Sequence, residues 1–583
     1  MDKFVIQGGK RLEGTVRIAG SKNSSVAILP ATILAKGKFR IENVPDIDDI
    51  LVIIDILKHL GAKVEITTNS LGEKVFEIDT TDVEPKDIPY ALSSKLRASY
   101  YFIGSLLGRF RSARVAMPGG CSFGSVRPID MHLKAFEDLG ATTKTLGNIE
   151  IELKKPSVVA TLNAILAAIR SSGTTIIKNA STDDIIKDVI SDLKNRNANI
   201  EGGGTDTITV AGCKLDTTLL ETNTDIRFDE HSETATLNFI LMALNSNCTT
   251  VIHHASKDAG FVTLADSLNK MGANIKGAGT DTLTIGPAKA TNSSYGIVEA
   301  VADELIGTTI NFNKVSVGAT MNAIMAAVLA KGKTVIKNAA REPHIVDLAN
   351  FLNHMGANIR GAGSSSPIEI TGVEELHGCE WTIIPDQIEA GTYMVAAAIT
   401  KGHITLTNIE PKHLSSITSK LRECGCVINE QYDSVEVIAG SRLNAVGLTT
   451  APHPGFPTDM QPQFTTLLSV CEGSCGVNDG IWEDRFRYVK QLKKMGADIE
   501  VAQNNKSALV KGVPTLNGTL VKADDLRAGA AMIIAGLGAQ GETVIENISH
   551  IDRGYEDVVE KLTSLGAVIE RRSFPDIVCD SCG

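Results

Sequence analysis

Residues 331–361, KGKTVIKNAAREPHIVDLANFLNHMGANIRG, contain one unit of a pattern that recurs along the chain. The β-branched run TVIKN predicts a short strand, and the polar residues after it lead into an amphipathic helix. The phrase MGANIRG predicts a turn at its Gly-Ala pair and then another strand. Strands and helices that alternate in this way indicate an α/β fold.

The Gly-Ala phrase or a close variant begins at positions 60, 139, 196, 271, 355, 424, 495 and 565. These positions lie mostly about 70 to 80 residues apart, as expected for a repeated supersecondary unit. Helices rich in small residues precede the strands, as in VGATMNAIMAAVLA from Val317 and LRAGAAMIIAGLGA from Leu526. Because these helices are apolar on nearly every face, we expect them to be buried behind sheets built from βαβαββ-like repeats.

The chain has 583 residues and a formal net charge of −11. Its length predicts two or more domains, and its acidic balance argues against a general nucleic-acid or anionic-membrane binder. We expect a cytoplasmic protein, because the first residues lack a signal-like apolar segment and no apolar run reaches the length of a membrane span. The tail pair Cys579 and Cys582 has neither the other ligands of a zinc site nor the helix of a redox motif, so no metal site and no cofactor is predicted.

A glycine-rich segment, MPGGCSFGSVRPIDMH from Met117 to His132, carries Cys121 directly after two glycines. Paired glycines suit a mobile loop that covers a ligand. Arg127 follows six residues later, and a guanidinium beside a cysteine favours the reactive thiolate. The segment alone is equally compatible with a surface turn that holds an incidental cysteine.

Ordered motifs along the chain resemble those of the enolpyruvyl transferases, and most closely the members that act on UDP-N-acetylglucosamine. The similarity covers residues 1 to about 148 and about 296 to 575. Besides the PGGC segment, it rests on SKNSSVAILPATILA, SSKLRASYYFIGSLLGRF, NKVSVGATMNAIMAA, NAAREPHIVDLANFL, APHPGFPTDMQPQFTTLL, IWEDRFRYV, KADDLRAGAAMIIAG and HIDRGYEDV. The resemblance implies a two-domain inside-out α/β barrel of six repeats, three in each domain, with the active site between the domains.

The implied reaction transfers the enolpyruvyl group of phosphoenolpyruvate to the 3-hydroxyl of UDP-N-acetylglucosamine by addition and elimination. It releases phosphate, needs no metal, and is the first committed step of peptidoglycan synthesis. Joining two anions requires a cluster of cations, an acid for the vinyl carbon and a base for the sugar hydroxyl. The sequence offers candidates for each of these groups.

The resemblance implies a role for each of these candidates. Cys121, the residue that fosfomycin-type epoxides alkylate in the family, and Asp459, the candidate base, would be catalytic together with Lys22 and Arg553. Phosphoenolpyruvate would contact Lys22, Arg97, Arg127 and Arg553. The UDP-sugar would contact Asn23, Arg97, Arg127, Pro128, Ile129, Asp130, Lys314, Ser316, Val317, Gly318, Asp459 and Ile481. Other residues of the cleft would be His453, Arg485, Asp525 and Arg527, although His453 could equally be a residue that orders its loop.

Two of these positions also have a physical reason for binding anions. Lys22 stands just before a predicted helix, where its ammonium group and the helix N-terminus together could hold an anion. The run KVSVG from Lys314 to Gly318 opens another predicted helix, whose amides could cradle a diphosphate.

The sequence departs from the family pattern within the implied site. Five residues separate Cys121 from Arg127 where the family normally has four, and Gln387 stands where the family usually has arginine. These changes keep two alternatives open: a degenerate paralogue that binds UDP-sugars or regulates, and a carboxyvinyltransferase with another acceptor. The 3-phosphoshikimate enzyme ranks low because it lacks the PGGC loop and the RPID motif.

The largest departure is a segment of extra sequence, residues 149–295, that holds two further copies of the repeat. The copy from Lys155 parallels the one from Lys314, whereas the copy from Ser232 has lost the KVSVG signature. Val159 replaces Gly318, and we expect its side chain to obstruct a phosphate. The copies therefore indicate scaffold without ligand chemistry.

A closed ring of three repeats has no room for two more, so we expect a separate lobe or a contact with a partner chain, including a second copy of this one. The predicted domains are 22–148 plus 296–384, the inserted lobe 149–295, and 1–21 plus 385–583.

Overall fold

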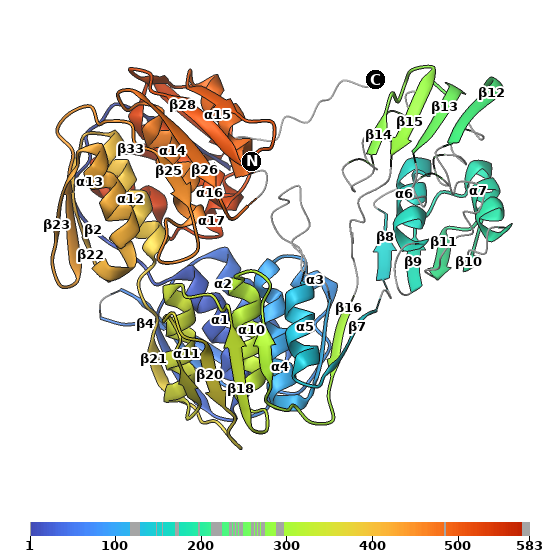
Figure 1. Cartoon of the computed structure of the whole chain (residues 1–583), viewed down its shortest axis with the longest axis horizontal. Helices are drawn as coiled ribbons and strands as arrows, with labels where there is room; N and C mark the ends of the chain where they lie inside the picture. The colour runs from blue at the N-terminus through green and yellow to red at the C-terminus, as the bar shows by residue number, and fades with distance from the viewer. Residues whose placement is uncertain are drawn as a thin grey trace. The chain divides into compact units, whose positions relative to one another are not determined.

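A computed structural model describes most of the chain as two compact units (Figure 1). Unit 1 comprises residues 1–113, 118–142 and 300–583, and unit 2 comprises residues 114–117 and 143–299. The described residues are 2–70, 72–116, 129–146, 149–153, 156–169, 174–195, 199–211, 224–232, 236, 240, 243, 249–257, 262, 265, 269, 274–286, 297–482 and 485–573.

Residues 309–371 show the repeat in full. It consists of β17 (Thr309–Asn311), α10 (Val317–Ala327), β18 (Lys333–Lys337), α11 (Pro343–His354), β19 (Asn358–Arg360) and β20 (Ile368–Thr371). The strands form a sheet in the order β17-β18-β20-β19. β17 and β18 are parallel, and β20 runs antiparallel to β18 and β19. The predicted βαβαββ unit is therefore present.

Four other sheets of unit 1 have the same pattern of four strands. The first contains β21 (Glu380–Thr382), β3 (Lys38–Val44), β5 (Lys74–Asp79) and β4 (Lys63–Thr68), with α1 (Lys22–Ala31) and α2 (Asp48–His59). The second contains β2 (Glu13–Arg17), β22 (His403–Thr407), β24 (Ser434–Ile438) and β23 (Val427–Glu430), with α12 (Gln387–Ile399) and α13 (Ser415–Cys424).

The remaining two four-stranded sheets lie in the C-terminal part of the chain. One contains β25 (Leu448–Thr450), β26 (Ser474–Asp479), β28 (Ser507–Lys511) and β27 (Asp498–Val501), with α14 (Gln461–Leu468) and α15 (Val489–Lys494). The other contains β30 (Leu520–Lys522), β32 (Glu542–Glu546), β1 (Asp2–Gln7) and β33 (Val568–Ser573), with α16 (Leu526–Gly538), α17 (Ser549–Asp552) and α18 (Val558–Ser564). β1 lies between β32 and β33, so the start of the chain completes its last repeat.

A three-stranded sheet, in the order β6-β16-β7, belongs to the second repeat along the chain. Its strands are β6 (Ser112–Ala116), β7 (Thr142–Leu146) and β16 (Ile297–Val301), and the adjoining helices are α3 (Tyr90–Ser93), α4 (Tyr101–Phe110) and α5 (Asp130–Asp138). β7 and β16 are neighbours, as β19 and β20 are in the complete repeat. The extra sequence therefore enters the chain between the third and fourth strands of one repeat.

Unit 2 contains two further sheets with the same strand order. The first has β8 (Ile149–Glu152), α6 (Val158–Ile169), β9 (Thr174–Lys178), α7 (Asp184–Asn195), β10 (Asn199–Glu201) and β11 (Thr207–Ala211). The second has β12 (Thr224–Ser232), β13 (Thr250–Ala255), β14 (Asn274–Lys276) and β15 (Thr282–Gly286). Ile165 and Ile177 of the first repeat share one buried hydrophobic cluster with Ile252 and Ile285 of the second. The two inserted repeats thus have a common core.

The same polar residues shape the repeats at corresponding places. Asn338 and Asn179 follow β18 and β9 with φ angles of 54° and 55°. Each donates a side-chain hydrogen bond to the carbonyl of a residue after the first strand, Phe312 (2.9 Å) and Leu153 (2.7 Å). Asparagine tolerates this left-handed conformation, so it turns the chain from the strand into the next helix.

The small-residue helices are buried, as their composition predicts. Nearly every residue of α10, α12 and α16 is inaccessible to solvent, and β20 alternates buried and exposed residues. Short elements complete unit 1, namely β29 (Leu516–Asn517), β31 (Ala539–Gln540), η1 (Thr32–Leu34), η2 (Arg97–Tyr100), η4 (Pro411–Leu414), η5 (Thr458–Met460) and η6 (Arg485–Tyr488). Among the described residues, no helix has both the length and the apolar composition needed to cross a membrane.

Candidate active site

Helix N-termini carry several of the predicted site residues. Lys22 is the first residue of α1, Ser316 caps α10, and Asp525 caps α16. Asp459 lies in η5, directly before α14. Amide groups of a first helical turn lack helical partners and give that end of the helix a positive potential. The repeated fold therefore places polar side chains where anions are favoured.

Lys22 and Arg553 share one carboxylate, that of Asp49. Asp49 Oδ2 lies 2.7 Å from Lys22 Nζ, and Arg553 Nε donates to Asp49 Oδ1 at 2.7 Å. Lys22 Nζ also donates to the Arg553 carbonyl oxygen at 2.9 Å. Burial lowers the pKa of Lys22, and the charge of Asp49 acts in the opposite direction. The pair of cations is thus held together by a buried acid that the sequence analysis did not identify.

Asp459 forms a second cluster with two arginines. Arg485 Nη2 donates to its Oδ1 at 3.1 Å, and Arg527 Nη2 donates to its Oδ2 at 3.0 Å. Arg485 and Arg527 are 5% and 6% exposed, whereas the Asp459 side chain is 33% exposed. Burial disfavours the charged form of Arg527, but the charge of Asp459 raises the pKa of Arg527 overall. A partly accessible carboxylate held by two buried guanidinium groups is oriented by them.

The charges of Arg527 and Asp386 link the two clusters. The charge of Arg527 acts on Lys22 and contributes to its lowered pKa, after burial and the opposing effect of Asp49. Asp386, the N-cap of α12, accepts a hydrogen bond from the Lys22 amide at 2.9 Å. The Asp386 charge also acts on Arg527. Gln387, where the family usually has arginine, is the first residue of α12 beside this carboxylate.

The first turn of α10 packs against His132 and Tyr100. The Ser316 hydroxyl accepts a hydrogen bond from the Ala319 amide at 3.3 Å. A Cβ at Gly318 would lie 2.8 Å from both His132 Cε1 and Tyr100 Oη. This contact gives a reason for glycine different from the expected approach of a phosphate. A valine at position 318 would meet these two side chains whether or not a phosphate bound there.

His132 is held as a neutral imidazole. Burial, followed by the nearby charge of Arg97, lowers the pKa of His132 to about 3. Asn322 accepts a hydrogen bond from the Gly104 amide through Oδ1 at 2.9 Å, so its Nδ2 faces His132 Nδ1 at 3.0 Å. The neutral ring therefore carries its proton on Nε2. Arg97 begins η2, close to this group.

The remaining predicted residues occupy separate positions. The His453 amide lies 3.5 Å from Glu342 Oε1, and the Ile481 amide donates to Asp479 at 2.9 Å. Ile129 is buried and caps α5, whose first residue is Asp130. Asn23, Lys314 and Val317 are partly or fully exposed on the first turns of α1 and α10 or just before them. Cys121, Arg127, Pro128, Cys579 and Cys582 lie outside the described residues.

Asp525 caps the N-terminus of α16 and also lines a groove. Its Oδ1 accepts hydrogen bonds from the amides of Arg527 (2.8 Å) and Ala528 (2.9 Å). The groove has a volume of about 860 Å³, and Arg487 and Lys490 also line it.

Sequence reasoning missed three residues that lie against the candidate site residues. Asp49 lies in VPDIDDI, where an acidic pair at a helix start has an ordinary explanation in the helix dipole. His132 and Tyr555 stand inside motifs already quoted, but their roles depend on partners far away in the sequence. Tyr555 Oη accepts from Arg527 Nη1 at 3.3 Å and lies 3.0 Å from Thr392 Oγ1. The only sequence signal for Tyr555 is its position two residues after Arg553.

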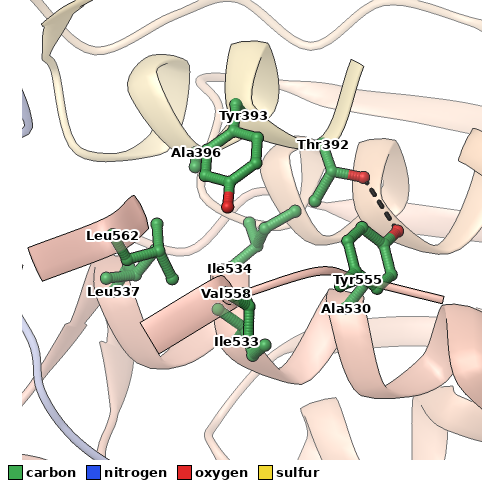
Figure 2. A pocket seen from close by; sticks show the side chains of 10 residues that line it. All are labelled: Thr392, Tyr393, Ala396, Ala530, Ile533, Ile534, Leu537, Tyr555, Val558 and Leu562. Carbon is green, nitrogen blue, oxygen red and sulfur yellow. Dashed lines mark hydrogen bonds between the residues drawn. The ribbon is translucent and has the colours of Figure 1, made fainter. Parts of the chain in front are cut away.

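Tyr555 is one of the residues that line a small cavity (Figure 2). Its volume is about 10 Å³, and its lining is formed by Thr392, Tyr393, Ala396, Ala530, Ile533, Ile534, Leu537, Tyr555, Val558 and Leu562. The Tyr393 hydroxyl points toward the middle of this apolar group and has no hydrogen-bond partner among the described residues. The cavity is too small for a substrate, so it is a packing defect of the core.

A family model and solved structures show the class to which this protein belongs. The family model of EPSP synthase (3-phosphoshikimate 1-carboxyvinyltransferase) matches residues 6–220 and 290–562. The enolpyruvyl transferase NikO from Streptomyces tendae has a similar structure, with a TM-score of 0.62 and 22% identity, covering 98% of this chain and 99% of that chain. EPSP synthase from Acinetobacter baumannii aligns with a TM-score of 0.53 and 14% identity, covering 98% and 100%. The chain has the enolpyruvyl transferase fold.

Curated relatives are much more similar in sequence. A UDP-N-acetylglucosamine 1-carboxyvinyltransferase of Clostridium botulinum is 40% identical, over 98% of this chain and 100% of the relative. UDP-N-acetylglucosamine 1-carboxyvinyltransferase 3 of Caldanaerobacter subterraneus is 38% identical, over 98% and 99%. The chain belongs to the UDP-N-acetylglucosamine 1-carboxyvinyltransferase family.

Proposed function

We propose that this chain transfers the enolpyruvyl group of phosphoenolpyruvate to the 3-hydroxyl of UDP-N-acetylglucosamine and releases phosphate. The names and identities of the relatives support this reaction, which begins peptidoglycan synthesis. The observation that carries the proposal is the joint site of Lys22, Arg553 and Asp459, because it combines cations for the anionic substrate with an oriented carboxylate. We further propose a cytoplasmic location, the compartment in which both substrates would be found.

The proposed chemistry proceeds in two steps. In the addition, the sugar 3-oxygen forms a bond to C2 of phosphoenolpyruvate, C3 gains a proton, and the sugar hydroxyl loses one. In the elimination, the C2–O bond to phosphate breaks and a proton leaves C3, which restores the double bond. Asp459 is the proposed acceptor of the hydroxyl proton, and Cys121 the proposed donor to C3.

Cations stabilise the charge in both steps. Lys22 and Arg553 are proposed to exchange part of their interaction with Asp49 for the phosphate and carboxylate of phosphoenolpyruvate. The α10 N-terminus, with Ser316 and Lys314, is proposed to bind the diphosphate of the sugar nucleotide. Residues on both predicted domains of unit 1 would then contact the substrates, so binding favours closure of the site.

Phosphate release tests the proposal. The full chain is mixed with phosphoenolpyruvate and UDP-N-acetylglucosamine. In a parallel reaction, 3-phosphoshikimate replaces the UDP-sugar as the acceptor. We expect release that needs the UDP-sugar and is strongly reduced in Cys121→Ser and Asp459→Asn. Fosfomycin should label wild type but not Cys121→Ser. Equal release by wild type and both variants, or release only with 3-phosphoshikimate, would contradict the proposal.

A further inference from the structure

A buried carboxylate of α11, that of Asp347, has no role in the reaction proposed above. Asp347 is 2% exposed, and no cation of the described residues pairs with it. Carboxylates are rarely buried without a cation, because removal from water disfavours their charge. Its surroundings therefore require an explanation.

One hydrogen bond holds this carboxylate, and donors of two other segments act on it electrostatically. Trp381 Nε1 on β21 donates to Asp347 Oδ1 at 3.1 Å. The Ile384 amide, on the segment between β21 and α12, acts on the same carboxyl group. The Ser24 hydroxyl on α1 also acts on it, although Ser24 Oγ and Asp347 Oδ2 lie outside full hydrogen-bond geometry.

Ser24 connects Asp347 to the site. It is fully buried in the first turn of α1, next to Asn23 and Lys22. The same turn is held from the other side, because the Ser21 amide donates to the Ile384 carbonyl oxygen at 2.7 Å and the Lys22 amide donates to Asp386 at 2.9 Å. The carboxylate thus lies where α1, α11 and the segment before α12 meet.

We propose that Asp347 is a positioning residue that holds the first turn of α1, and with it Lys22 and Asn23, in the orientation needed for substrate binding. This inference rests on the proposed function. Asp347 touches no reacting group and acts through Ser24 and Ile384. Fixing a binding group by a buried hydrogen-bonding shell is a common way to orient it.

The protonation of Asp347 gives this role a measurable signature. Burial raises the pKa of Asp347 to about 6 from its ordinary value of 3.8, and the three donors only partly oppose this effect. A carboxyl pKa that folding raises stabilises the fold at low pH, and this contribution is lost as the pH rises through about 6. At neutral pH the ionised group therefore costs stability while it orients the turn.

The other charged and titratable groups near Asp347 do not supply it with a paired cation among the described residues. Lys22, the only charged residue of α1, pairs with Asp49, and Asp386 caps α12. His344 and His354 share the face of α11 with Asp347, and His354 packs against the Trp381 ring at 5.9 Å. The buried His344 Nε2 has no partner among the described residues. Burial lowers the pKa of His344, so it adds no positive charge at neutral pH.

Asp347→Asn removes the charge but keeps the shape of the side chain. We expect it to raise the melting temperature at pH 7.5, with a gain that shrinks by pH 5, and to lower kcat/KM for phosphoenolpyruvate about tenfold at pH 7.5. The wild-type kcat/KM should fall as the pH drops through about 6, and the variant should lack this limb. Ser24→Ala should also lower kcat/KM for phosphoenolpyruvate. The double variant should have nearly the same kcat/KM as Asp347→Asn alone.

The inserted repeat provides a matched control. Asp188 occupies the position on α7 that Asp347 occupies on α11, and Asp188→Asn should leave kcat/KM unchanged. A wild type that releases no phosphate would refute the proposed function. If the wild type is active and Asp347→Asn has the same kcat/KM and the same fall in kcat/KM at acidic pH, this inference alone is refuted.

Hydrogen exchange tests the positioning without any substrate. At pH 7.5, amides of residues 22–25 should exchange faster in Asp347→Asn than in wild type, although the variant melts at a higher temperature. Unchanged exchange there, or a loss of activity that accompanies a lower melting temperature, would show that Asp347 is only structural.

Discussion

The repeat at residues 309–371 and the inserted repeat at 149–211 have the same fold but differ in their chemistry. Thr320 Oγ1 accepts from the Ala340 amide at 3.0 Å, and Thr161 Oγ1 accepts from the Ser181 amide at 2.8 Å. The strand-ending asparagines also correspond. Gly318, by contrast, is replaced by valine. Residues that shape the unit persist in both copies, whereas the residue that packs against a site histidine does not.

This comparison teaches where function is added to a repeated fold. The site of unit 1 lies at helix N-termini, which every repeat possesses. Its charged clusters form where side chains of one repeat meet those of another, as Lys22 and Asp49 of one repeat meet Arg553 of the last. A repeat by itself is therefore a scaffold, and its chemistry depends on its neighbours.

Asp459→Asn should cause the largest loss of activity, because it removes chemistry that the inserted repeats are expected to lack. The amide keeps the shape of the carboxylate but cannot accept the sugar proton, so kcat should fall about 10³-fold. Initial rates of phosphate release measure this effect. Circular dichroism of the variant serves as the control, because Arg485 and Arg527 lose a charged partner. A folded variant with wild-type kcat would remove Asp459 from the mechanism.

Exchanging the glycine and valine that distinguish the two repeats should have the next largest effect, on stability and on UDP-sugar binding. In Gly318→Val, the Cβ would approach His132 and Tyr100 to 2.8 Å, closer than such contacts allow. We expect a loss of about 1–3 kcal/mol in the free energy of unfolding and weaker UDP-sugar binding, measured by denaturant titration and calorimetry. Val159→Gly in the insert is the reciprocal control and should leave binding unchanged. Equal effects of both substitutions would mean that the two repeats are functionally equivalent.

Asp49→Asn should shift the pH dependence of activity. Lys22 must be protonated to bind an anion, and burial already lowers its pKa while Asp49 opposes that effect. Removing the Asp49 charge lowers the pKa of Lys22 further, so the alkaline limb of kcat/KM for phosphoenolpyruvate should move to lower pH. Asp48→Asn, one residue earlier on α2, should leave the limb in place. An unchanged limb in Asp49→Asn would show that Lys22 does not control it.

Tyr393→Phe should have the smallest effect and should act on stability alone. The substitution removes a buried hydroxyl that has no partner among the described residues. The free energy of unfolding should rise by about 1 kcal/mol, without a change in kcat. Tyr555→Phe is the matched comparison, because it removes hydrogen bonds to Thr392 and Arg527 and should destabilise the protein. A destabilised Tyr393→Phe would indicate a partner for this hydroxyl.

The repeats could be predicted because their signals are local. Each Gly-Ala phrase leads into the third strand of a repeat, and the small-residue helices are buried as their composition indicates. The class of enzyme followed from ordered motifs. The division of unit 1 into two domains, the role of Cys121 and a partner for the insert remain predictions.

The missed residues depend on contacts between distant segments. Asp49 and Arg553 are separated by 504 positions, and His132 and Asn322 by 190. A single sequence carries no signal for such pairs when each residue also has an ordinary local explanation. Gly318 illustrates the same limit, because the His132 and Tyr100 side chains that a Cβ would meet there lie far from it in the sequence.

Removal of the inserted repeats tests the central claim, that the chemistry resides in unit 1. Residues 147–296 are deleted, and Leu146 of β7 is joined to Ile297 of β16 by a short turn, because these strands are neighbours in one sheet. The measurement is phosphate release from phosphoenolpyruvate and UDP-N-acetylglucosamine. We predict a kcat/KM within about threefold of the full chain, since no proposed site residue lies in the deleted segment. A folded deletion variant that releases no phosphate would contradict the account.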